Sequence, residues 1–121
     1  MGVNGKGTTT GDPSVRREER GEIGIVRIPF PAIDAVRMIE IESACVDMPP
    51  VTALDFRAVK YINSTGMSAL LKFAVAARKQ GYKLFAINLS LHHHKVFKQV
   101  EIARFMPIIA EHELKNGVPG V

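Results

Sequence analysis

Residues 51–80 read VTALDFRAVKYINSTGMSALLKFAVAARKQ, and this stretch decides the fold. Its first six residues are mostly apolar and are followed by a break, which is typical of a strand buried on both faces of a parallel sheet. From Ser64 to Gln80 the apolar side chains recur at helical spacing. They are Met67, Leu70, Leu71, Ala74 and Ala77. Asn63 suits a helix N-cap and Gly81 a helix stop. The stretch therefore predicts a buried strand, a short connection and a helix.

The sequence on either side predicts more elements of the same two kinds. They are a strand over 23–28, a strand over 82–89, a helix over 91–102 and a short last strand over 106–109. Pro107 restricts that last strand to an edge or an end. Strands that alternate with helices predict an α/β domain with crossover connections.

Residues 32–46 fit two patterns. Ile33, Val36, Ile39 and Ala44 could form one helical face. The shorter run 38–42, however, alternates between apolar and polar residues like a strand. The residues alone leave both interpretations open.

The length and the two ends of the chain limit its organisation. A chain of 121 residues suits one domain. Residues 1–20 are polar and almost without apolar side chains, which predicts a flexible tail. Residues 111–121 predict a loose tail or a short helix. No apolar run is long enough to span a bilayer, and the first 22 residues lack the apolar core of a secretory signal. We therefore expect no membrane insertion and a cytoplasmic location.

The segment Asn63-Ser64-Thr65-Gly66-Met67, which opens a helix after a strand, resembles the central motif of STAS domains. That family carries an Asp-Ser-x-Gly-Leu element in this place. Residues 77–84 resemble the family's basic helix end, glycine and next strand, and residues 88–97 resemble its next strand–helix unit. The resemblance covers about Glu22 to Ile109. It implies one STAS-like domain over 21–110, with a mixed or parallel sheet of about four to five strands and helices packed mainly on one face. In that setting, residues 32–46 should be helical.

The resemblance is to the anti-sigma factor antagonist type. It implies a regulatory module that binds a serine-protein kinase, itself an anti-sigma factor, and is released when the kinase phosphorylates the motif serine. Carried onto this chain, the phosphorylated residue is Ser64, and the partner-binding residues are Asn63, Ser64, Thr65, Gly66 and Met67. The chain departs from the motif at Asn63, where the family has an aspartate. ATP belongs to the kinase, so no cofactor is expected.

Three other interpretations of the chain and of Ser64 stay open. The chain could be a constitutive STAS scaffold subunit of a membrane transport complex or of another signalling complex. Ser64 could only stabilise the helix start. A small hydrolase using Ser64 is a more distant reading, since no spacing of Ser, His and Asp supports a catalytic triad. We therefore predict that the chain is not an enzyme.

The remaining conspicuous residues indicate structural roles and no catalytic or metal-binding role. Cys45 is the only cysteine and suits a small buried hydrophobe. His92, His93 and His94 would spread around a helix at about 100° each, which predicts a solvated helix start and no metal site. Asp55 suits a strand end that bonds a nearby loop. Basic residues alternate with acidic ones, as in residues 16–20, so we expect no direct nucleic-acid binding.

Overall fold

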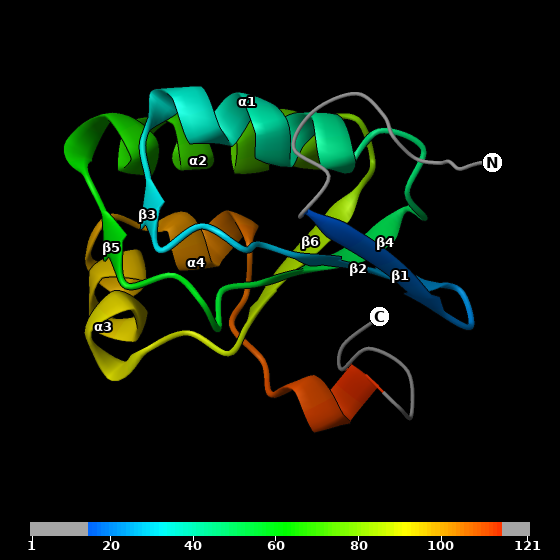
Figure 1. Ribbon diagram of the computed structural model, residues 1–121. Helices are drawn as coiled ribbons and strands as arrows, with labels where there is room; N and C mark the ends of the chain where they lie inside the picture. The colour runs from blue at the N-terminus through cyan, green and yellow to red at the C-terminus, as the bar shows by residue number, and fades with distance from the viewer. Residues whose placement is uncertain (1–14, 115–121) are drawn as a thin grey trace, which may run out of the picture.

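The computed structural model describes residues 15–114. The strands are β1 (Arg16–Arg20), β2 (Ile23–Arg27), β3 (Ala32–Ile33), β4 (Val51–Asp55), β5 (Tyr61–Ile62) and β6 (Lys83–Ile87). The helices are α1 (Ala35–Ala44), α2 (Ser64–Lys79), α3 (Leu91–Gln99), α4 (Ile102–Phe105) and the 3-10 helix η1 (Glu111–Leu114). Figure 1 shows α1 and α2 side by side above the sheet. It shows α3 and α4 lower down, on the side where β3 and β5 are drawn. None of the helices within 15–114 is long and apolar enough to cross a membrane.

Four strands form one sheet in the order β1-β2-β4-β6. β1 is antiparallel to β2, whereas β2, β4 and β6 run parallel. Ala53 in the middle of β4 lies opposite Ile25 on one side and Phe85 on the other, and all three are buried. β3 and β5 form a separate two-stranded parallel ladder. The predicted α/β fold with a mixed sheet is therefore confirmed, with four strands in the sheet.

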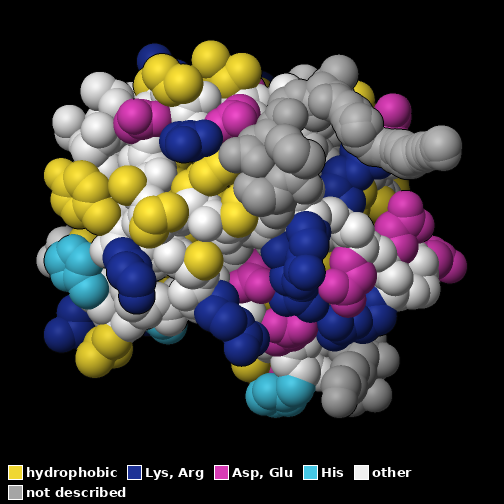
Figure 2. Space-filling view, in the orientation of Figure 1, with side chains coloured by type: hydrophobic (Ala, Val, Ile, Leu, Met, Phe, Trp, Pro, Cys, Tyr) yellow, Lys and Arg dark blue, Asp and Glu magenta, His cyan; other side chains and the backbone are white. Residues whose placement is uncertain are grey.

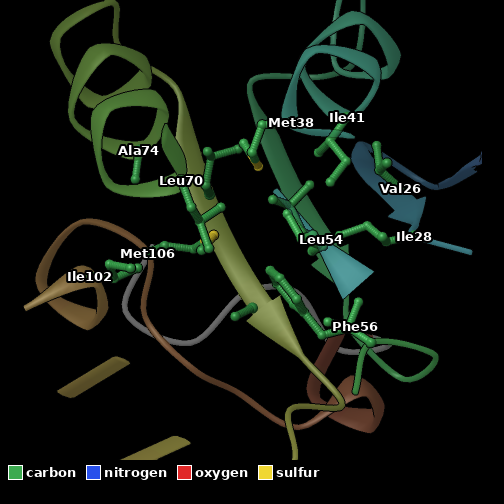
Figure 3. Close-up of a cluster of buried hydrophobic side chains, with 14 of the residues drawn as sticks. Val26, Ile28, Met38, Ile41, Leu54, Phe56, Leu70, Ala74, Ile102 and Met106 are labelled. Carbon is green, nitrogen blue, oxygen red and sulfur yellow. The ribbon is translucent and has the colours of Figure 1, made fainter. Parts of the chain in front are cut away.

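The helices α1 to α4 pack on one face of the sheet, as predicted. Strand residues that point to this face, such as Val26 and Leu54, join helix residues in one buried cluster, drawn in Figure 3. The helices contribute Met38, Ile41, Leu70, Ala74, Phe97 and Ile102. The rings of Phe56 and Phe97 meet edge to face, with centroids 5.5 Å apart. Such burial of apolar area is the main stabilising contribution to a domain of this size.

The second face of the sheet holds a smaller buried cluster. Alternate residues of the three parallel strands point to it, including Ile25, Ala53 and Ile87. Leu114 of η1 packs against them and is buried. The short helix expected within 111–121 is thus present at 111–114 and covers this face; residues 115–121 lie outside the described part of the chain.

The expectation of a tail through residue 20 is wrong for Arg16–Arg20. This segment pairs with β2 along its whole length, from Arg16 opposite Arg27 to Arg20 opposite Ile23. Its side chains are charged, so the apolar pattern gave no sign of a strand. Backbone hydrogen bonds and ion pairs from Glu18 and Arg20 hold it instead. Residues 1–14 of the predicted tail lie outside the described residues.

The predicted last strand is reduced to a single parallel bridge between Ala86 and Ile108. The amide of Ala86 donates to the carbonyl of Pro107, and the amide of Ile109 donates to the carbonyl of Ala86. Proline has no N–H to extend a ladder, which accounts for the short pairing. The helix expected over 91–102 is also divided, because Glu101 adopts φ of 65° between α3 and α4.

The segment 32–46 is helical from Ala35, but its buried face differs from the predicted one. Met38 and Ile41 point into the core. Val36 and Ile39, which with Ile33 and Ala44 could have formed one apolar helical face, are 67% and 65% exposed. The sequence could not identify the buried face because apolar residues occur on both sides of this helix.

Candidate functional site

Asn63 holds the start of α2 as an N-cap, as its position in the sequence predicted. Its Oδ1 accepts a hydrogen bond from the amide of Gly66 at 2.8 Å and another from Oγ1 of Thr65 at 2.8 Å. Its backbone carbonyl accepts from the amide of Met67 at 2.8 Å. One amide oxygen thus fixes the first turn of the helix and orients the neighbouring hydroxyl group.

Gly66 allows the α2 start to lie against the end of β3. A Cβ atom built at this position would lie 2.4 Å from the carbonyl oxygen of Ile33 and 3.1 Å from Cα of Asp34. Both contacts are with backbone, which cannot rotate out of the way. The glycine of the motif is therefore required by packing, and it lies in direct contact with Ile33, 33 residues earlier in the chain.

The starts of α1 and α2 lie side by side, each after one strand of the β3–β5 ladder (Figure 1). The amide of Asn63 donates to the carbonyl of Ile33 at 3.1 Å. The amide of Ala35, at the first turn of α1, donates to Oγ1 of Thr65 at 3.3 Å. Asp34 caps α1 by accepting from the amide of Arg37 at 2.8 Å. Two helix N-termini thus converge on one surface.

The five motif residues have different exposures. Ser64 and Thr65 are exposed, Asn63 and Met67 are half-buried, and Gly66 is buried. Met67 packs against the main core. Only Ser64 and Thr65 therefore present most of their side chains to a partner, while the other three hold the helix start in place. Whether all five contact a partner stays a prediction.

Apolar side chains around this helix start were not among the predicted site residues. Val36 and Ile39 on α1 are exposed, and Tyr61 of β5 is 62% exposed just before the motif. Figure 2 shows hydrophobic side chains on the surface over α1 and around β5. We call Val36, Ile39 and Tyr61 the apolar rim. The sequence signal that could have identified part of it is the apolar content of both faces of α1.

The structure changes the interpretation of the histidine triplet. His92 is exposed, but His93 is only 3% exposed, so the predicted solvated helix start is wrong at this residue. His93 points inward one turn before Phe97, as spacing of four residues on a helix requires. Its Nδ1 has no hydrogen-bond partner in the described part of the chain. Burial and the neighbouring His92 lower the pKa of His93.

Asp55 behaves as the sequence predicted, whereas Cys45, predicted to be buried, is half-buried. The carboxylate of Asp55 accepts from the amide of Arg57 at 2.9 Å, from the side chain of Asn88 at 2.8 Å and from Arg27 at 2.7 Å. It thus ties the end of β4 to the following loop and to the end of β6. Cys45 packs against the main core. Burial, together with the charge of Glu42, raises the pKa of the Cys45 thiol to about 12, so the thiol stays protonated.

Solved structures of SpoIIAA and of TM1081 have the same architecture. The structure of phosphorylated SpoIIAA from Bacillus is 17% identical, with a TM-score of 0.61 over 85% of this chain and 97% of that chain. The unphosphorylated form of SpoIIAA, an anti-sigma factor antagonist, is 17% identical with a TM-score of 0.58 over 89% of this chain and 100% of that chain. The NMR structure of TM1081 from Thermotoga maritima is 12% identical with a TM-score of 0.69 over 98% and 100%. At these identities the likeness establishes the fold.

The family is established by a sequence model. The model of the STAS domain matches residues 14–114, most of the chain. The chain therefore belongs to the STAS domain family, as the motif around Ser64 indicated. No curated protein sequence matches it significantly.

Proposed function

We propose that this chain is a partner-switching regulator of the anti-sigma factor antagonist type. It binds a serine-protein kinase that acts as an anti-sigma factor, through the α2 start and the apolar rim. Phosphorylation of Ser64 by that kinase releases it. The chain acts by binding and not by catalysis, and it needs no cofactor of its own.

The exposure of Ser64 at the first position of α2 is the observation that carries this proposal. α2 has 16 residues, and its N-terminal amides and dipole favour a negative charge nearby. A phosphate on Ser64 would extend into solvent without any change in the core, because neither Ser64 nor Thr65 is buried. The modification can therefore alter a surface while leaving the fold intact.

The apolar rim supplies the second part of the argument. Val36, Ile39 and Tyr61 give a partner apolar area next to a serine that carries no charge before modification. A phosphate would bring about −1.5 to −2 charges into that contact at pH 7. Removing such a charge from water without a cation opposite it is strongly unfavourable. Release then follows from desolvation and repulsion alone.

Asn63, in place of the family's aspartate, is compatible with this switch. Its Oδ1 already supplies the two hydrogen bonds that fix the first turn. An aspartate oxygen could accept the same two bonds, so the difference lies in the charge beside Ser64. We expect Asn63→Asp to preserve the fold and to change only the rate of phosphorylation.

Phosphorylation and binding measurements test the proposal. The protein is incubated with a candidate serine kinase and ATP, and phosphate is located by mass spectrometry; it should be on Ser64 and be absent in Ser64→Ala. In a pull-down or calorimetric titration, Ser64→Ala should bind the kinase like the unmodified protein. Ser64→Asp should bind at least tenfold more weakly.

Ser43→Asp is the matched control, because Ser43 is exposed near the far end of α1. It adds the same charge away from the site and should leave binding unchanged. Normal binding by Ser64→Asp would contradict the switch and support the constitutive scaffold instead. Ester hydrolysis that disappears in Ser64→Ala would favour a hydrolase.

A further inference from the structure

A hollow of about 850 Å³ opens where β2 and β4 end, away from Ser64. Three arginines line it, Arg16 from β1, Arg27 from β2 and Arg57 from the loop after β4. The carboxyl ends of parallel strands are where open α/β sheets commonly bind ligands. Figure 2 shows basic and acidic side chains gathered on this side of the molecule, over β1 and β2.

Three carboxylates line the hollow, and all three are already engaged. Glu18 pairs with Arg20 and Arg27. Asp55 is bound by Arg27, by Asn88 and by the amide of Arg57. Glu111 accepts from Arg27 at 3.0 and 3.3 Å and from Asn88 at 2.9 Å. These bonds hold Arg27 and the three acids in fixed positions. Arg27 and the carboxylates of the hollow therefore already have hydrogen-bond partners.

Two of the arginines are not held in this way. The side chain of Arg16 has no hydrogen bond or ion pair to any residue within 15–114. Arg57 reaches Glu111 only at 3.4 Å, and its side chain is 72% exposed. With Arg20 beside them, four arginines face three carboxylates. The hollow thus offers two available guanidinium groups and an excess of positive charge.

We propose that this hollow binds the phosphate monoester of a small organic molecule. Arg16 and Arg57 bind the phosphate, since a guanidinium group presents paired donors that match its oxygens. The organic part packs on the apolar wall that Ile28, Pro29 and Ala58 provide. Pro29 and Ala58 belong to the connections that lead to β3 and β5, so the ligand lies against the segments that position α1 and α2. This site does not depend on phosphorylation of Ser64.

Titration of the full chain with ribose 5-phosphate tests the proposal, followed by ¹⁵N NMR and calorimetry at constant ionic strength. Ribose and inorganic phosphate are the comparison ligands. We expect saturable binding of ribose 5-phosphate, at least threefold weaker binding of inorganic phosphate and no binding of ribose. The perturbed amides should belong to residues 16, 27, 28 and 55–58.

Arg16→Gln and Arg57→Gln should each weaken binding of ribose 5-phosphate about tenfold, the loss of one charge-assisted hydrogen-bonding partner. Arg104→Gln is the matched control, because Arg104 is an exposed arginine on α4 whose guanidinium group pairs with Glu101. It should leave the affinity unchanged. An equal loss in all three variants would show general charge attraction and overturn the proposal. Equal affinity for inorganic phosphate, or perturbed amides elsewhere, would also overturn it.

Discussion

Replacing Glu111 by glutamine should lower the free energy of unfolding by roughly 2 kcal/mol. The carboxylate accepts hydrogen bonds from Arg20, Arg27, Arg57 and Asn88, and so ties η1 to β1, to β2 and to the segments that follow β4 and β6. Hydrogen bonds from Arg27 and then from Asn88 lower the pKa of Glu111 from 4.5 to about 2. That difference corresponds to roughly 3 kcal/mol at neutral pH. Solvent reaches a fifth of the side chain, which reduces the expected effect to roughly 2 kcal/mol.

The pH dependence of this contribution follows from the direction of the shift. The folded protein holds Glu111 ionised down to about pH 2, whereas the unfolded chain protonates it near 4.5. The unfolded state therefore binds more protons between these values, and stability falls as the pH falls. The contribution is fully present above about pH 5 and is lost by about pH 2. Glutamine cannot ionise, so the variant lacks this dependence.

Urea unfolding followed by far-UV circular dichroism measures the effect at pH 7 and at pH 3. The difference between wild type and Glu111→Gln should be largest at pH 7 and clearly smaller at pH 3. Glu101→Gln is the control, because Glu101 forms an exposed pair with Arg104 and should change stability by under about 0.5 kcal/mol. A difference between wild type and Glu111→Gln that stays constant with pH would refute the electrostatic reasoning. An unchanged stability at pH 7 would refute the role of η1 as a fixed part of the fold.

Three further changes test the site and the core. Gly66→Ala should lower the free energy of unfolding by about 2–3 kcal/mol, since the new methyl group meets the Ile33 carbonyl; Ser68→Ala on the exposed face should not. Asn63→Ala should cost about 1 kcal/mol in the same assay, and Asn63→Asp should restore most of it. Stability should fall as the pH drops below 6.5, because the folded state disfavours protonation of His93, and His93→Leu should reduce this slope between pH 7 and 5. An unchanged slope in that variant would contradict the assignment to His93.

Elements that depend on a short local pattern could be predicted from the sequence. The apolar run of β4 predicted a strand buried on both faces, and Asn63 with Gly81 marked the ends of α2. The site could be placed because Asn63, Ser64 and Gly66 are consecutive parts of one cap. The predicted phosphorylation of Ser64 requires a partner kinase. The fold of this chain therefore cannot establish it.

The errors occurred where distant residues decide the structure. β1 carries charged side chains and is held by its ladder with β2 and by Glu111, which follows it by some 90 residues. The exposed face of α1 depends on which side of that helix the sheet covers, and its sequence is apolar on both sides. His93 was expected in solvent, but the orientation of α3 turns it inward. Each of these outcomes follows from tertiary contacts that no local pattern contains.

The same two connections link the two proposed sites. The loop from β4 to β5 carries Arg57 and Ala58 toward the hollow, and after Tyr61 it leads into Asn63. The connection from β2 to β3 bonds to it, since the carbonyl of Pro31 accepts from the amides of Lys60 and Tyr61. A ligand that orders these connections would also order the start of α2. Binding of a phosphate monoester should therefore change the affinity for the partner, and reciprocally the partner should change the affinity for the ligand by the same factor.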